Sequence, residues 1–339
     1  MVYSIIKQIQ SGLKNLQLRK ITLYLLFLLL SSTTQAQLDT LVPRSQPRSF
    51  PKLPRSSEAL GISPAIEQRN SKTPNAPVNI ALFGTDSRNS QVEGNADVII
   101  ILSINPSNQK IKMSSILRDT YVDIEGIGMD KINAAYAKGG PLLAIKTINQ
   151  NFALDIKDYI HVDFLSAAAI VDALGGVNIN LKSEELTYLN NYVKEISFDG
   201  DIPVAPIMKA GLQKLNGRQA VAYTRIRDAG RGDYERTDRQ KMVLVSLFSK
   251  MQGGGVSLLP VFLSKVLPNL ETSMNQLSLL SIGSSILNSK TKLIEQGRFP
   301  LDSASKGERI NNTWYLKTDL KATSASLYNF IYKDVMPGK

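Results

Sequence analysis

Acidic and basic side chains that could handle phosphate groups recur at the ends of predicted strands. Asp86 follows the apolar run 78–83, Asp97 opens the next apolar run, and Arg118 follows a third. A second polar group comes far along the chain and comprises Arg225, Arg227, Arg236 and Gln240. Loops at the ends of strands are where α/β sheets bind ligands. The spacing therefore predicts one site built from both groups.

The residue types indicate which ligand this site would take. Guanidinium groups donate two parallel hydrogen bonds to phosphate oxygens. A carboxylate pair such as Asp86 and Asp97 suits a hard divalent cation that bridges the same phosphates. We therefore expect a pyrophosphate or phosphodiester site with Mg²⁺ or Mn²⁺. The alternatives are that the Arg-rich stretch 218–241 is a solvated, salt-bridged face, and that Asp86 and Asp97 are only turn and cap residues.

The composition excludes several other kinds of active site. The 339 residues include no cysteine and one histidine, His161. Disulfide scaffolds, thiolate nucleophiles and zinc sites built from cysteine or several histidines are therefore ruled out. A Ser-His-Asp triad would have to use His161, which lies in a strand-like segment with no nucleophile motif nearby, so we expect a structural role for it.

The elements that must position these residues alternate between strands and helices. The sequence predicts strands over residues 78–83, 97–104 and 110–116, and the last two are expected to form a hairpin. Two further segments are strand-like, 159–164 and 177–181. Helical spacing covers the following ranges: 141–152, 164–174, 238–251, about 258–268, 275–289 and 322–332. Such alternation predicts an α/β domain whose sheet is covered on both faces. The apolar helices 141–152, 164–174 and 242–251 are expected to be core unless a tunnel passes through them.

The N-terminus is typical of an export signal. Four basic residues precede the apolar run 21–30, which small and polar residues follow up to Ala36. We expect residues 1–36 to be a signal peptide or signal-anchor rather than a core helix, with the rest of the chain outside the membrane. Recurrent prolines predict a basic linker over 37–77. The catalytic domain is then expected over 78–335.

The charge distribution argues against nucleic acid as a partner. The formal net charge is +11, yet residues 1–77 hold ten of the 40 Lys and Arg residues and three of the 29 Asp and Glu residues. Most of the excess positive charge is thus in the N-terminal tail. A nucleic-acid-binding domain would carry it on its folded part.

Seven motifs in order give the chain a resemblance to a known family. They are Gly84-Thr-Asp-Ser-Arg88, Ala96-Asp-Val-Ile-Ile100, Ser115-Ile-Leu-Arg-Asp-Thr-Tyr-Val122, Lys131-Ile-Asn-Ala-Ala-Tyr-Ala-Lys-Gly-Gly140, Val171-Asp-Ala-Leu-Gly-Gly-Val177, Leu215-Asn-Gly-Arg-Gln-Ala-Val-Ala-Tyr-Thr-Arg-Ile-Arg227 and Arg236-Thr-Asp-Arg-Gln240. This pattern, over about residues 78–252, resembles the LytR-CpsA-Psr family. The resemblance implies a three-layer α/β/α sandwich with a mixed central sheet. It also implies a location in the bacterial cell envelope and a tunnel for a polyprenyl chain. It also implies an enzyme that transfers a glycopolymer from a polyprenyl-pyrophosphate carrier to peptidoglycan through a phosphodiester.

The resemblance also implies roles for single residues. Asp86 and Asp97 match the family's magnesium-associated aspartates, and Arg118 matches its key arginine. The pyrophosphate ligands would be Arg88, Arg118, Arg225, Arg227, Arg236 and Gln240. A hydroxyl of peptidoglycan would attack the phosphorus next to the glycopolymer, with Asp86 or Asp97 as the base.

The sequence departs from the family pattern in three places. Leu117 stands where the family has proline, Asn95 where it often has a phosphate-binding arginine, and Met129-Asp130 where it often has histidine. The loss of an arginine at position 95 weakens one phosphate contact. Two other functions stay open: a non-catalytic polyprenyl-(pyro)phosphate-binding regulator of wall assembly, and a lipid pyrophosphatase.

Overall fold

The computed structural model describes residues 52–72, 76–86, 94–105, 110–196, 204–229, 233–287 and 294–338. All of these residues fall within one unit, residues 50–339. The segment 1–36 that we expect to direct export lies outside them, as does Arg88. Among the residues described, no helix has the length and apolarity needed to cross a membrane.

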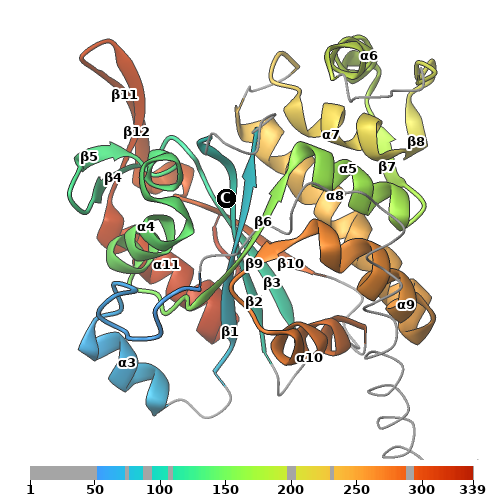
Figure 1. Ribbon diagram of the computed structural model, residues 1–339. Helices are drawn as coiled ribbons and strands as arrows, with labels where there is room; N and C mark the ends of the chain where they lie inside the picture. The colour runs from blue at the N-terminus through green and yellow to red at the C-terminus, as the bar shows by residue number, and fades with distance from the viewer. Residues whose placement is uncertain are drawn as a thin grey trace, which may run out of the picture. The chain divides into compact units, whose positions relative to one another are not determined.

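A six-stranded mixed sheet lies at the centre of this unit (Figure 1). Its strands run in the order β10-β3-β2-β1-β6-β9 and have the bounds β1 (Val78–Thr85), β2 (Ala96–Ile104), β3 (Ile111–Ile116), β6 (Asp158–Asp163), β9 (Glu271–Thr272) and β10 (Glu295–Phe299). β1–β2 and β2–β3 are antiparallel, whereas β1–β6 and β3–β10 are parallel. The expected hairpin of the second and third strands is confirmed.

Side chains alternate between the two faces of the sheet, as the period of a β-strand requires. In β2, Ile99 and Ile101 belong to one hydrophobic cluster, and Ile100 and Leu102 belong to another. Both faces are therefore buried, which explains why this strand is a nearly continuous apolar run in the sequence.

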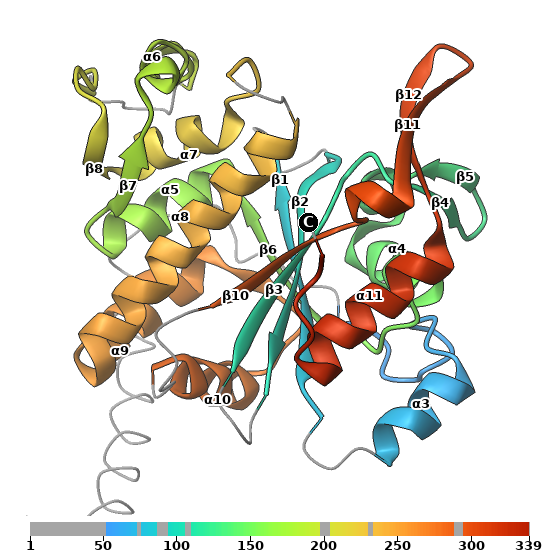
Figure 2. The same ribbon diagram turned by 180° about the vertical axis from the view of Figure 1, so that it is seen from behind.

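Helices cover the two faces as separate layers (Figures 1 and 2). One layer consists of α4 (Ala134–Phe152) and α11 (Leu320–Lys333), with α3 (Pro64–Ser71) beside them. The other consists of α5 (Phe164–Ala173), α8 (Asp233–Gly254) and α10 (Gln276–Leu287). Further elements pack against α5 and α8, namely α6 (Leu186–Glu195), α7 (Gly217–Arg225), β7 (Val177–Leu181) and β8 (Gly211–Leu215). The predicted three-layer α/β/α fold class is confirmed.

A glycine and a proline interrupt α4. α4 is kinked at Gly140, whose φ of 62° is in the left-handed region, and Pro141 begins its second part.

Residues 255–269 do not form the single helix expected at about 258–268. They form short 3₁₀, α and π turns that include α9 (Leu259–Val261).

Part of the expected linker over 37–77 packs onto the domain. Leu53, Leu60 and Ile62 are buried in the cluster that contains α4, and Asn149 donates from Nδ2 to the carbonyl oxygen of Leu60 at 2.8 Å. One of the prolines there has a clear role, since Pro64 is the first residue of α3. Residues 52–72 therefore form part of the folded unit.

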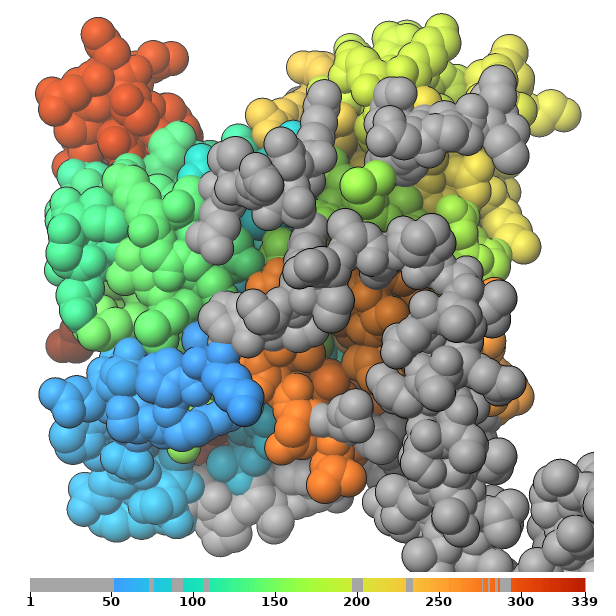
Figure 3. All heavy atoms as spheres, viewed as in Figure 1, coloured from blue at the N-terminus to red at the C-terminus, as the bar shows by residue number. Residues whose placement is uncertain are grey.

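Two hairpins extend the α4 side of the structure. They are formed by β4 (Tyr121–Ile124) with β5 (Gly128–Lys131) and by β11 (Ser305–Ile310) with β12 (Thr313–Thr318). The rings of Tyr121 and Tyr315 pack 4.7 Å apart between them. In the space-filling view the tip of β11–β12 stands clear of its neighbours (Figure 3).

Candidate functional site

A β-bulge at the end of the β1–β2 pair positions the two predicted aspartates. Gly84 pairs with Val98 and Thr85 pairs with Ala96, so Asp97 is an extra residue in β2. A bulge locally redirects the chain and often lies beside an active site. It brings Asp97 to the same end of the sheet as Asp86, the residue after β1.

Ion pairs join these aspartates to three of the predicted arginines. Arg118 donates from Nη1 to Oδ1 of Asp97, and Arg227 Nη2 lies 4.0 Å from Asp97 Oδ2. Arg225 Nη2 lies 3.8 Å from Asp86 Oδ2. The two sequence groups, more than a hundred residues apart, are thus brought together. We call these five residues the arginine–aspartate cluster.

The loop that follows β3 is fixed by Asp119, whose part in the site the sequence did not reveal. Its Oδ1 lies 2.6 Å from Lys131 Nζ and its Oδ2 lies 3.7 Å from Arg118 Nε. The backbone N–H of Leu316 donates to its carbonyl oxygen at 2.8 Å. Asp119 therefore ties Arg118 to β5 and to β12. The adjacency of Arg118-Asp119 was the only signal for it.

Arg236 and Gln240 lie in a cleft with members of the cluster. Both are buried on α8, and both line the same cleft as Asp97 and Arg118. The stretch 218–241 is therefore not a wholly solvated face, because Arg236 is only 3% exposed. All the predicted site residues that the structure describes are brought together. Arg88 lies outside the described residues.

A neighbouring arginine, Arg239, holds the loop that carries Arg227. It is 1% exposed, and its guanidinium donates to Glu185 Oε1 at 2.8 Å and to the carbonyl oxygens of Ile226 and Ala229 at 3.0 and 3.1 Å. A buried charge needs such complete pairing. Arg239 thus positions residues 226–229 against α8.

Arg225 is also held by aromatic rings. Its guanidinium lies 5.3 Å from the centre of the Phe164 ring and 5.4 Å from that of Tyr192. Burial raises the pKa of the Tyr192 phenol, and the negative charge of Asp228 raises it further. Tyr192 consequently stays neutral beside the arginine at ordinary pH.

The histidine has the structural role that we expected. His161 is buried, with Nδ1 3.0 Å from Glu271 Oε2 and Nε2 2.9 Å from Thr85 Oγ1. Its ring lies 5.2 Å from that of Tyr136. These contacts join β6, β9 and the end of β1, and so support the residue that precedes Asp86.

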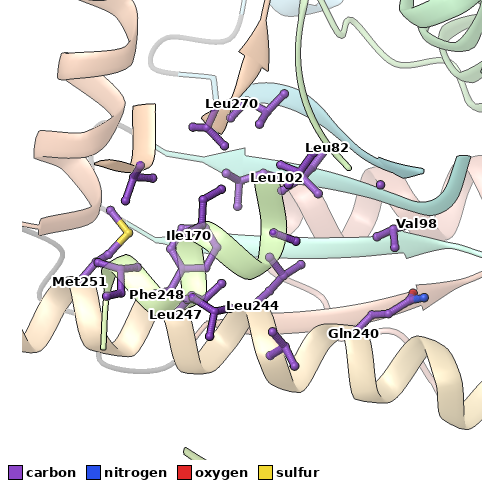
Figure 4. A pocket seen from close by; sticks show the side chains of 18 of the residues that line it. Leu82, Val98, Leu102, Ile170, Gln240, Leu244, Leu247, Phe248, Met251 and Leu270 are labelled. Atoms are coloured by element: carbon purple, nitrogen blue, oxygen red, sulfur yellow. The ribbon is translucent and has the colours of Figure 1, made fainter. Parts of the chain in front are cut away.

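A large apolar cavity opens beside the arginine–aspartate cluster. Its volume is about 220 Å³, and its lining includes Leu82, Val98, Ile170 and Phe262. Along α8 the lining residues run from Gln240 through Leu244, Leu247 and Phe248 to Met251 (Figure 4). These positions span about 16 Å of helix. Helices 164–174 and 242–251 therefore line a cavity and are not solid core, whereas 141–152 packs on the opposite face as core.

The donor set of the site fits a magnesium ion. Within the described part of the chain, no group of three or more His, Asp or Glu side chains could hold a metal. Asp86 and Asp97 nevertheless offer hard carboxylate oxygens from one sheet edge. Mg²⁺ commonly binds through one or two carboxylates and completes its shell with water and substrate phosphate. The aspartates suit that arrangement and would not suit zinc.

Comparison with known proteins identifies relatives that match most of the folded unit. A model of the LytR_cpsA_psr family matches residues 53–330. The polyisoprenyl-teichoic acid–peptidoglycan teichoic acid transferase TagU of Oceanobacillus iheyensis is 34% identical over 251 residues, which cover 70% of each chain.

Solved structures show the same fold. TagV of Bacillus subtilis has a TM-score of 0.60 and 26% identity, covering 76% of this chain and 98% of that one. YwtF (TagT) of Bacillus subtilis, solved with bound octaprenyl pyrophosphate lipid, has a TM-score of 0.57 and 22% identity, covering 76% and 92% of the respective chains.

Proposed function

The chain belongs to the LytR-CpsA-Psr family, and on that premise we propose that it transfers a glycopolymer from a polyprenyl-pyrophosphate carrier to peptidoglycan. The main observation behind the proposal is that two unlike surfaces lie next to each other. Gln240 lines both the apolar cavity and the cleft that holds Asp97, Arg118 and Arg236. A ligand that fits both must be amphiphilic, with an apolar tail and a strongly anionic head. A polyprenyl pyrophosphate has these two parts.

The relatives support the same assignment. TagU is named as a transferase from a polyisoprenyl carrier to peptidoglycan, and the related TagT structure holds a polyprenyl pyrophosphate. The polyprenyl chain lies in the cavity along α8. The pyrophosphate is held by Arg118, Arg225, Arg227 and Arg236.

Each phosphate-binding residue acts through position and charge. Arg118 and Arg227 converge on Asp97, so their guanidiniums are oriented before the substrate arrives. The acceptor hydroxyl attacks the phosphorus that carries the glycopolymer, a new P–O bond forms, and the bond to the bridging oxygen breaks. Polyprenyl phosphate leaves with that oxygen. Preorganised arginines stabilise the charge that develops on the phosphoryl oxygens.

The two aspartates have different surroundings and take different parts. Asp97 is 20% exposed and forms ion pairs with Arg118 and Arg227, whereas the Asp86 side chain is 39% exposed. An acceptor hydroxyl can reach the more exposed carboxylate more easily, so Asp86 is assigned as its base. Asp86 and Asp97 would hold Mg²⁺, which when bound supplies positive charge to the pyrophosphate.

The location of the reaction follows from the acceptor. Peptidoglycan lies outside the cytoplasmic membrane, and residues 1–36 carry the pattern of an export signal or membrane anchor. We place the folded unit in the cell envelope, close to the membrane that supplies its lipid carrier.

The test is transfer by the full-length chain with Mg²⁺, a polyprenyl-pyrophosphoryl sugar and a soluble peptidoglycan oligomer. Mass spectrometry should show an oligomer that has gained a sugar phosphate, together with polyprenyl phosphate. Free sugar phosphate without an adduct would instead indicate a lipid pyrophosphatase. Bound but unchanged lipid would indicate a regulator that binds polyprenyl carriers. Either result would overturn the proposed transfer.

A further inference from the structure

Two aromatic side chains border the cleft that holds Asp97, Arg118 and Arg236. Tyr234 comes from α8 and Trp314 from β12, and both line this cleft together with Gln240. Along α8, Arg236 lies between Tyr234 and Gln240, and from Gln240 onward the helix lines the apolar cavity. A ligand whose tail fills the cavity and whose pyrophosphate meets the arginines therefore extends its next group toward the aromatic pair.

The position of Trp314 is fixed by the hairpin that carries it. A Cβ atom built on Gly307 would lie 1.8 Å from the end of the indole ring, so the ring rests directly over that glycine. Trp314 is nevertheless 48% exposed. The indole is thus held in place by β11 but keeps a large surface for a ligand.

The hairpin is in turn joined to the phosphate-binding loop. Leu316, two residues from Trp314, donates its N–H to the carbonyl oxygen of Asp119, and Thr120 forms a bridge with Leu316. The opposite face of the hairpin packs through Tyr315 on Tyr121. Trp314 therefore has a defined place relative to Arg118, although the hairpin projects beyond its neighbours (Figures 1 and 3).

Tyr234 is held by a contact with β10. The Arg298 guanidinium lies 4.5 Å from the centre of its ring, and Arg298 Nη2 donates to Asp302 Oδ1 at 2.9 Å. Two rings from separate elements are thus anchored near the same cluster of charges.

Aromatic rings beside charged groups match the chemistry of a sugar. A pyranose ring has an apolar C–H face that can lie on an aromatic ring and a rim of hydroxyls that can bond carboxylates and guanidiniums. We propose that Trp314 and Tyr234 form a subsite for the first sugar ring that follows the pyrophosphate of the donor. This inference rests on the proposed function, and it assigns recognition of the donor sugar to the β11–β12 hairpin.

Fluorescence tests the subsite directly, because Trp314 is the single tryptophan of the chain. The full-length chain is titrated with polyprenyl-pyrophosphoryl N-acetylglucosamine and, separately, with sugar-free polyprenyl pyrophosphate. The sugar-bearing lipid should cause a saturable change in emission, and the sugar-free lipid should cause a much smaller one. Equal changes with both, or no change with the sugar-bearing lipid while transfer proceeds, would overturn the subsite.

Variants give a second measurement that does not depend on emission. Trp314→Ala should raise KM for the sugar-bearing donor about tenfold, a loss typical of one stacking contact. Trp314→Phe should recover most of it, and Gly307→Ala should mimic the loss by displacing the indole. Met129→Ala, an equally exposed residue on the neighbouring β5, should have no effect. An unchanged KM in Trp314→Ala would contradict the subsite while leaving transfer itself established.

Discussion

Asp97 and Arg118 lie opposite each other where β2 begins and β3 ends. Ile100 pairs with Ser115 in this hairpin, and the same register continued outward sets Asp97 against Arg118. Arg118 donates to the Asp97 carboxylate there. The central ion pair of the site is therefore a product of strand register and hairpin geometry.

Removal of Arg118 should abolish most of the transfer activity. Arg118→Ala loses a group that stabilises the phosphoryl oxygens, and we expect a fall in kcat of at least about a hundredfold. Arg118→Lys should recover little, because an ammonium cannot form the two parallel hydrogen bonds. Arg55→Ala is the matched control, since Arg55 is an exposed arginine. Its partner Asp158 begins β6, at the end of that strand that lies away from the arginine–aspartate cluster. Activity of Arg118→Ala near the wild-type value would remove this arginine from the mechanism.

Metal dependence should follow the two aspartates. Chelation should stop transfer, and Mg²⁺ or Mn²⁺ should restore it. Asp97→Asn and Asp86→Asn should each raise the Mg²⁺ concentration needed for half-maximal rate by about tenfold or more. Asp123→Asn, on the β4–β5 hairpin, serves as the control. Full activity of the chelated wild-type protein would show that no divalent ion takes part.

Blocking the apolar cavity should discriminate between lipid lengths. Leu244→Trp places a large ring in the lining on α8, so a long polyprenyl donor should lose most of its kcat/KM. A donor with a short prenyl chain should lose much less, because its tail does not reach past the new ring. Ser249→Trp lies on the exposed face of the same helix and should leave both donors unaffected. Equal losses for the two donors in Leu244→Trp would place the lipid elsewhere.

Much of this arrangement could be predicted from the sequence, because local patterns encode it. The apolar runs predicted the strands β1, β2 and β3. The polar residues at the ends of these runs, Asp86, Asp97 and Arg118, were predicted to belong to one site. The family motifs linked these residues to Arg225, Arg227, Arg236 and Gln240. The comparisons with known proteins confirm the three-layer fold and the transferase class.

Other parts depend on tertiary structure and had no local signal. β10 is a polar edge strand, Glu-Gln-Gly-Arg-Phe, that joins the sheet through its backbone. Whether α8 lines a cavity or fills a core depends on how far its neighbours stand from it, which periodicity does not report. Trp314 joins the site only because β12 is hydrogen-bonded to the loop that follows Arg118.

Arg239 should contribute to stability more than any exposed arginine. Arg239→Ala leaves Glu185, which is only 2% exposed at its side chain, without its charged partner. Removal of one member of a buried pair costs about 3–5 kcal/mol of unfolding free energy. Urea titration should show this loss, and Arg55→Ala should change stability by about 0.5 kcal/mol or less. A loss below about 1 kcal/mol in Arg239→Ala would mean that the pair is not needed for the fold.

The end of α11 should make stability depend on pH. Hydrogen bonds from Lys112 and Lys110 hold the pKa of Asp334 below its ordinary value of 3.8. A carboxyl whose pKa is lower in the folded state stabilises the fold above its unfolded pKa, and this contribution is lost as pH falls through the folded pKa.

Asp334→Asn isolates that contribution, since asparagine also accepts the left-handed backbone found there. The variant should be less stable than the wild type by about 1 kcal/mol at neutral pH. The difference in unfolding free energy between the variant and the wild type should shrink as the pH is lowered from about 6 to about 3. A difference that does not vary with pH would show that the charge of Asp334 is not responsible.

Transfer to peptidoglycan can be followed through a single phosphorus atom of the donor. The donor carries ³²P in the phosphate that is bonded to its sugar, and the full-length chain is given Mg²⁺ and a peptidoglycan oligomer. Attack at that phosphorus should place the label in the oligomer, and the released polyprenyl phosphate should be unlabelled. Label recovered as free sugar phosphate, or retained on the lipid while the oligomer stays unmodified, would show that the protein does not transfer the glycopolymer to peptidoglycan.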